Sequence, residues 1–134
     1  MFGSLDISAS ALVAQRQRLT AISANMALRN VAVDPNADPN DFRRRIPIFA
    51  PGDPVSGRSE GVHLKDILFD QSPFTLKWDP GHSYADEQGY VKYPNIDPSM
   101  EMVNAIEASR AYEANITAAE ATKVMLRASL RLLA

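Results

Sequence analysis

Proline and glycine are confined to the middle of this chain. All nine prolines lie between Pro35 and Pro98, and five of the six glycines lie between Gly52 and Gly89. Because proline removes a backbone donor and clashes with the preceding turn, long helices are excluded from the middle and permitted at both ends. We therefore predict a mainly α-helical fold with a small β region.

The length, composition and charge narrow the class of protein. A chain of 134 residues forms one ordinary domain, or one small domain with extensions. The net charge of −2 indicates neither a nucleic-acid nor a membrane surface, and the absence of cysteine excludes disulfides and thiolate metal sites. We expect three regions: an N-terminal helix at 1–30, a loop-rich middle with short strands at 31–97, and a C-terminal helix at 98–134.

The first residues do not have the pattern of a secretory signal. No basic segment precedes a continuous apolar run, so we expect no cleaved Sec-type signal peptide. No stretch approaches the roughly 18 apolar residues of a membrane-spanning helix. We therefore expect no direct membrane insertion.

A seven-residue repeat marks the N-terminal helix, which we expect from about Ser4 to Arg29. Its members are Leu5, Leu12, Leu19 and Met26, with Ser8, Gln15 and Ile22 between them. This is a heptad seam of the kind that packs against another helix. The pattern leaves open whether the seam folds onto its own domain or serves in an assembly.

The C-terminal helix has a clear start. Asp97 can cap it, Pro98 suits the first helical position, and Glu101 lies in the first turn, where the helix dipole favours an anion. Two adjacent lines of mostly apolar or small residues follow. The first line is Met102, Ala105, Ser109, Tyr112, Ile116, Ala119, Leu126, Leu130 and Leu133, and the second is Val103, Ile106, Ala114, Ala121, Met125, Ala128 and Leu132.

A helix with so much apolar circumference needs neighbours on more than one side. One N-terminal helix cannot cover both lines, and a whole face left in water would forgo several kcal/mol at about 25 cal/mol per Å² of apolar area. We expect the terminal helices to pack as a coiled-coil-like pair and other subunits to supply the missing contacts. The alternative is a loose helical pair with alanine-rich faces in solvent.

The middle region predicts short strands and turns. Alternating apolar and polar residues favour strands near 42–48, 61–70, 73–80 and 90–93, which would form a small sheet or hairpin. Pro47 restricts the first of these to an edge strand. The run of arginines at 43–45 either binds an acidic surface or, more often in proteins, forms a solvated face that discourages edge pairing.

Chemical sites are weakly indicated. His82, Asp86 and Glu87 could hold a cation, but their spacing is not that of established metal ligands. His63 and Asp66 could form an acid–base pair, yet histidines in a loop-rich segment are usually surface groups. We expect no catalytic residue, no cofactor and no metal, and we expect His82 only to shape a turn before a glycine of positive φ at position 89.

Several motifs occur together in the second half of the chain. From Asp79 to Met125 the sequence reads DPGHSYADEQGYVKYPNIDPSMEMVNAIEASRAYEANITAAEATKVM, which carries P-G-H, A-D, G-Y-V, P-N, E-M-V, A-S-R and A-N elements. This stretch resembles the C-terminal part of the FlgC family of bacterial flagellar basal-body rod proteins. The segment ISASALVAQRQRLTAISANMA near the N-terminus resembles the start of rod and hook proteins.

The resemblance implies a structural, non-enzymatic subunit of the proximal rod, the drive shaft that spans the periplasm. It implies contacts with other copies of the chain and other flagellar rod proteins, and passage through the flagellar type III export apparatus. It implies no nucleic acid and no small-molecule substrate. The subunit-interface residues that we predict are Leu5, Leu12, Leu19, Ile22, Met26, Met102, Ile106, Tyr112, Asn115, Ile116, Leu126 and Leu130.

Two alternatives stay open at this point. One is another short axial rod subunit of the same family. The other is of a different class, a helical adaptor or export chaperone, which would lack the GYVKYPN segment at 89–95.

Overall fold

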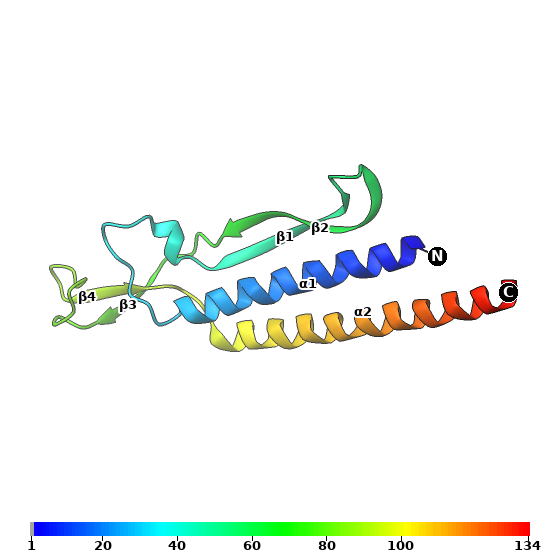
Figure 1. Ribbon diagram of the computed structural model, residues 1–134. Coiled ribbons are helices and arrows are strands. Elements are labelled where there is room, and N and C mark those ends of the chain that lie inside the picture. The colour runs from blue at the N-terminus through cyan, green and yellow to red at the C-terminus, as the bar shows by residue number, and fades with distance from the viewer. Residues whose placement is uncertain (1) are drawn as a thin grey trace.

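The computed structural model describes residues 2–134, which form two long helices with two β-hairpins between them in sequence (Figure 1). The elements are α1 (Phe2–Leu28), the short 3₁₀ helix η1 (Pro39–Phe42), β1 (Arg45–Asp53), β2 (Arg58–Phe69), β3 (Thr75–Trp78), β4 (Tyr90–Tyr93) and α2 (Pro98–Leu133). The predicted fold class, with breaker-free helices at both ends and short strands in the middle, is confirmed. Met1 lies outside the described residues.

The helix α1 lies between the other two long elements. Figure 1 shows α2 running antiparallel along one side of α1 and the β1–β2 hairpin lying along another side. The β3–β4 hairpin lies at the end where α1 finishes and α2 begins, and the N- and C-terminal ends lie together at the opposite end. The chain is therefore elongated, and most of its length is only two or three elements thick.

The heptad pattern of α1 predicts its inward side correctly. Ile22 is buried, and every other member of the predicted seam is half-buried. Two alanines of α1, Ala14 and Ala21, are also buried. Because alanine lets backbones approach closely, α1 can contact both a helix and a hairpin.

The start of α2 has the predicted cap. Asp97 Oδ1 accepts a hydrogen bond from the Ser99 N–H at 2.9 Å, and Pro98 occupies the first turn. At 1.5 Å per residue, the 36 residues of α2 span about 54 Å and the 27 residues of α1 span about 40 Å. In Figure 1, α2 extends beyond the start of α1. No helix among the described residues is long and apolar enough to cross a membrane.

The middle contains two separate antiparallel hairpins. In the first, β1 pairs with β2 from Arg45 opposite Phe69 to Asp53 opposite Arg58, with two register shifts. In the second, β3 pairs with β4, and both strands lie where the sequence predicts them. The predicted first strand begins too early, because residues 39–42 form η1, in which Asp38 Oδ1 accepts the Asn40 N–H at 2.9 Å.

The buried core is small. Apart from glycine and proline, the buried apolar residues are Ala14, Ala21, Ile22, Val33, Val91, Ile96 and Ala108. Two buried polar residues, Asn25 and Glu101, lie where α1, α2 and the start of β1 meet. Such a thin core leaves large surfaces of both helices free for other contacts.

Candidate subunit interface

A polar junction ties three elements together at one end of the helix pair. Glu101 in the first turn of α2 is fully buried, and one carboxylate oxygen accepts a hydrogen bond from Arg44 Nε, just before β1. The other oxygen accepts from Asn25 Nδ2 of α1 at 3.2 Å. Asn25 also bonds the backbone of Arg45 in both directions, donating to its carbonyl at 3.0 Å and accepting from its N–H at 2.8 Å. The junction therefore aligns α1, α2 and β1 through satisfied polar groups.

The prediction of a solvated arginine face is wrong. Arg43, Arg44 and Arg45 are all half-buried. Arg43 donates to the carbonyls of Asp70 and Ser72 at 3.0 Å each, and its guanidinium lies 4.8 Å from the centre of the Phe74 ring. Arg43 therefore holds the connection after β2 in place, and Arg44 joins the start of the hairpin to α2. The signal that sequence reasoning missed is that a carboxylate in the first turn of a buried helix end needs a cation.

The side of α2 that faces α1 is built from small and polar residues. Its buried or half-buried positions alternate at spacings of four and three, which is a heptad seam. They include Glu101, Ala105, Ala108, Tyr112, Asn115, Ala119, Thr122, Leu126 and Ser129. Only two of these, Tyr112 and Leu126, are large and apolar or aromatic, so this seam could not be found from hydrophobicity alone.

The rest of α2 carries the large apolar residues, and they are exposed. Met102, Val103 and Ile106 are 59%, 63% and 51% exposed. The exposed set continues to the end of the helix with Ile116, Val124, Met125, Leu130, Leu132 and Leu133. Large apolar side chains exposed together on one helix are common at sites of protein–protein contact. All members of the second line predicted from the sequence are exposed.

The twelve predicted interface residues fall into two groups. Eight are buried or half-buried within the chain: Leu5, Leu12, Leu19, Ile22, Met26, Tyr112, Asn115 and Leu126. Four are exposed and available to another molecule: Met102, Ile106, Ile116 and Leu130. The first group therefore includes the residues that hold the two helices together. The second group lies on the exposed side of α2, which we call its outer face.

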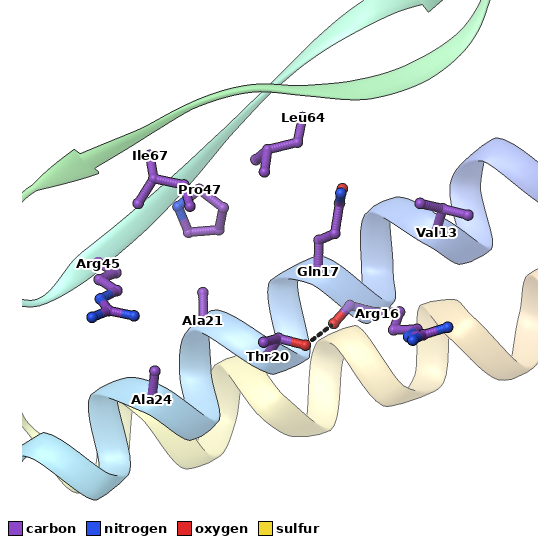
Figure 2. A pocket seen from close by; sticks show the side chains of 10 residues that line it. All are labelled: Val13, Arg16, Gln17, Thr20, Ala21, Ala24, Arg45, Pro47, Leu64 and Ile67. Atoms are coloured by element: carbon purple, nitrogen blue, oxygen red, sulfur yellow. Dashed lines mark hydrogen bonds between the residues drawn. The ribbon is translucent and has the colours of Figure 1, made fainter.

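An apolar groove of about 490 Å³ separates α1 from the β1–β2 hairpin. Figure 2 shows the side chains that line it: Val13, Arg16, Gln17, Thr20, Ala21, Ala24, Arg45, Pro47, Leu64 and Ile67. Pro47 and Ile67 are cross-strand partners, and both point from the hairpin toward α1. Sequence reasoning missed this groove, because it depends on where the hairpin lies relative to α1.

His82 takes part in a local turn, and His63 bonds across the β1–β2 hairpin. His82 Nδ1 accepts the Tyr84 N–H at 3.0 Å, and the carboxylate of Asp86 accepts the N–H groups of Gln88 and Tyr90. His63 Nδ1 lies 2.7 Å from the Gly52 carbonyl and donates to it. Among residues 2–134, no group of three or more His, Cys, Asp and Glu side chains is arranged to hold a metal ion.

Gly89 has the predicted positive φ, at 85°. A β-carbon at this position would lie 3.1 Å from both Pro80 Cβ and Trp78 Nε1. Both the conformation and the close contact therefore require glycine here. The turn at 79–89 positions β3 against β4 and brings no catalytic group together.

Two carboxyl groups beside the β1–β2 hairpin have lowered pKa values. The Ser56 side chain and the Val55 N–H hydrogen-bond Asp53 and lower its pKa. The hydroxyl and N–H of Ser72, at 2.6 and 2.9 Å, do the same for the pKa of Asp70. Both causes are hydrogen bonds from the next few residues, which stabilise turns and do not form an acid–base pair.

Comparison with known proteins places the chain in one family. A family model described as "Flagellar basal body rod FlgEFG protein C-terminal" matches residues 87–132. The flagellar basal-body rod protein FlgC of Borreliella burgdorferi is 39% identical, over 99% of this chain and 97% of its own length. The FlgC proteins of Bacillus subtilis and Aquifex aeolicus are 37% and 40% identical, over 98% and 92% of this chain and 97% and 90% of their own lengths.

The matches extend through both terminal helices and the middle. They include the segment that contains Asn25 and the segment that contains Glu101, which meet in the polar junction. The chain therefore belongs to the FlgC family of flagellar basal-body rod proteins.

Proposed function

We propose that this chain is a structural subunit of the flagellar basal-body rod, joined to its neighbours through its terminal helices. The similarity to FlgC proteins over nearly the whole chain supports this function. The structural observation that carries it is the outer face of α2, which exposes its large apolar residues to water. A helix that packs small residues against its own chain and exposes large apolar residues is suited to contacts with other subunits.

A subunit of the rod has to be held stiffly by its neighbours and does not have to catalyse a reaction. Torque is transmitted along the rod when many dispersed contacts hold each subunit to several neighbours, so no single contact has to be strong. A contact between two different surfaces of identical subunits builds a helical tube when its rotation does not close into a ring. The partners that we propose are other copies of the chain and other flagellar rod proteins, with no cofactor and no substrate.

We divide the twelve predicted interface residues by their exposure. Met102, Ile106, Ile116 and Leu130 contact neighbouring subunits directly. The buried and half-buried residues, such as Leu12 and Leu19, hold α1 against the rest of the subunit, and their exposed edges add to the contacts between subunits.

The location follows from the function. We propose that the chain lies in the part of the rod that spans the periplasm and reaches it through the flagellar type III export apparatus, without removal of a signal peptide.

Gene replacement tests the function. The gene is deleted in the bacterium that encodes it, and an epitope-tagged copy is returned on a plasmid. We expect the deletion strain to lose swimming in soft agar and the returned protein to be recovered in purified basal bodies with its N-terminal sequence intact. A protein found only in the cytoplasm, in a strain that still builds rods, would instead identify an adaptor or export chaperone.

A further inference from the structure

The groove between α1 and the β1–β2 hairpin has the chemistry of a binding site for a helix. Its walls are apolar, with Val13, Pro47, Leu64 and Ile67 among the residues that line it. Val13 is 56% exposed, so the groove leaves apolar surface in water. An amphipathic helix that lies in such a groove would cover this surface.

Two arginines, Arg16 and Arg45, line the groove. Figure 2 shows the Arg45 side chain beside the hairpin, and the Arg16 side chain at the edge of α1 nearer to α2. Within residues 2–134 neither guanidinium has a hydrogen-bond or ion-pair partner. Such an arginine can form a bidentate pair with a carboxylate of a partner.

The outer face of α2 has the matching pattern. Glu113 and Glu120 flank Ile116, which is 37% exposed, and neither glutamate forms an ion pair within residues 2–134. Seven residues separate the two glutamates, which is two helical turns, or about 10.5 Å. Ile106, seven residues before Glu113, lies on the same face of α2 and is also exposed.

The spacing of the two arginines fits that of the glutamates. The Arg45 backbone is bonded to Asn25, so Arg45 lies level with residue 25 of α1. Arg16 lies nine residues earlier, or about 13.5 Å along the helix axis. The difference from the glutamate spacing is about 3 Å, which the long arginine side chains can cover.

We infer that this groove receives the outer face of α2 from a second copy of the chain, with Ile116 in the groove and Glu113 and Glu120 beside Arg16 and Arg45. The inference rests on the proposed function. The chain's own α2 cannot make this contact, because it lies along a different side of α1 (Figure 1). The two surfaces are different, so each copy offers one surface to each of two neighbours and the contact can link more than two copies. The charges fix the register of the apolar contact.

Cross-linking tests the contact directly, because the chain has no cysteine and any introduced pair is unique. Thr20→Cys lies in the groove, and Ile116→Cys lies on the outer face of α2. The contacts Asn25–Glu101 and Arg18–Glu107 place Thr20 level with about residue 106, so Ile116 of the same chain lies about 15 Å further along. A disulfide within one chain is therefore excluded, because it needs Cα atoms within about 7 Å.

We expect basal bodies from cells that produce the double variant to contain a ladder of disulfide-linked dimers, trimers and larger species after mild oxidation. Each single variant gives none alone, and the two single variants produced together give dimers only. The matched control pairs Ala27→Cys, an exposed position of α1 beyond the groove, with Ile116→Cys and gives no ladder.

Charge reversal tests the register. Glu113→Arg with Glu120→Arg, or Arg16→Glu with Arg45→Glu, should lower the yield of the Thr20→Cys to Ile116→Cys product about tenfold. The chain that carries all four reversals should recover to within about threefold of the parent. Circular dichroism of each purified variant checks that its helix content is unchanged.

The outcomes separate this inference from the rod function. If the double-cysteine protein is recovered in basal bodies and supports swimming but forms no ladder, the groove contact is wrong and the rod function stands. A Thr20→Cys product with a different basal-body protein would assign the groove to that protein and overturn the second copy as its occupant. Absence of the wild-type chain from basal bodies would sink the proposed function itself.

Discussion

The large apolar residues of α2 are distributed between its two sides in the reverse of the way found in a helix of an ordinary monomeric protein. The side toward α1 contains Ala108 and Glu101, both with no exposed surface, and few large apolar residues. The side away from α1 exposes Met102 and Val103 by about three-fifths. A monomeric protein gains stability by burying its large apolar side chains. In this chain the close, partly polar contact joins α1 and α2, and the large side chains of the other side stay exposed.

This difference separates two kinds of mutational effect. Changes on the inner side should lower the free energy of unfolding of the isolated chain. Changes to the large apolar residues of the outer side should alter that free energy less and still prevent assembly.

Arg44→Met should have the largest effect, because it leaves the buried carboxylate of Glu101 without its cation. We expect a loss of about 3–5 kcal/mol in the free energy of unfolding, measured by urea denaturation. Arg18→Met breaks a more exposed pair with Glu107, at 3.3 Å, and should cost less than about 1 kcal/mol. Equal losses in the two variants would show that the inner junction does not stabilise the subunit.

A second change in the Arg44→Met background tests the cause. Glu101→Gln removes the buried charge and keeps an acceptor for Asn25 Nδ2. We expect the double variant to be more stable than Arg44→Met alone. If it is less stable, the loss in Arg44→Met comes from packing and not from an unpaired charge.

Replacing alanine with leucine should lower the free energy of unfolding on the inner side of α2 and leave it nearly unchanged on the outer side. Ala108→Leu adds three carbon atoms at a position with no exposed surface and should cost about 1–3 kcal/mol. Ala114→Leu makes the same change at an exposed position and should stay within about 0.5 kcal/mol of the parent. Both are measured by urea denaturation, with unchanged m-values as the check on two-state unfolding. A large loss in Ala114→Leu would mean that this side of α2 is covered in the isolated chain.

Sequence patterns predicted the parts of this fold that depend on local rules. The heptad of α1 was found because its period is regular, and the start of α2 was found because Asp97 and Pro98 have well-defined roles at a helix N-terminus. The strand at 90–93 was found from its alternation and from Gly89 before it. In each case the residues near one another in sequence decide the structure.

The assignment of α2 faces was only partly right, for a physical reason. The first predicted line mixes half-buried residues such as Tyr112 with exposed ones such as Ile116. Hydrophobic periodicity assumes that large apolar residues face the chain's own core, and in α2 they do not. The pairing of Glu101 with Arg44 and the groove beside the hairpin depend on contacts between distant segments, which the sequence does not order in space.

Ile116→Asp should have only a small effect on the stability of the isolated chain and should still prevent its assembly into basal bodies. Ile116→Asp places a charge at a position of the outer face that is 37% exposed, and should lower the free energy of unfolding by no more than about 1 kcal/mol. Thr117→Asp is the matched control, because both positions lie three and four residues from Glu113 and Glu120 and so carry the same like-charge repulsion. We expect Ile116→Asp to be absent from basal bodies and its strain not to swim, while Thr117→Asp is incorporated and swims. Normal swimming of the Ile116→Asp strain would show that the outer apolar face is not a subunit contact, and that the contrast between the two sides of α2 has another cause.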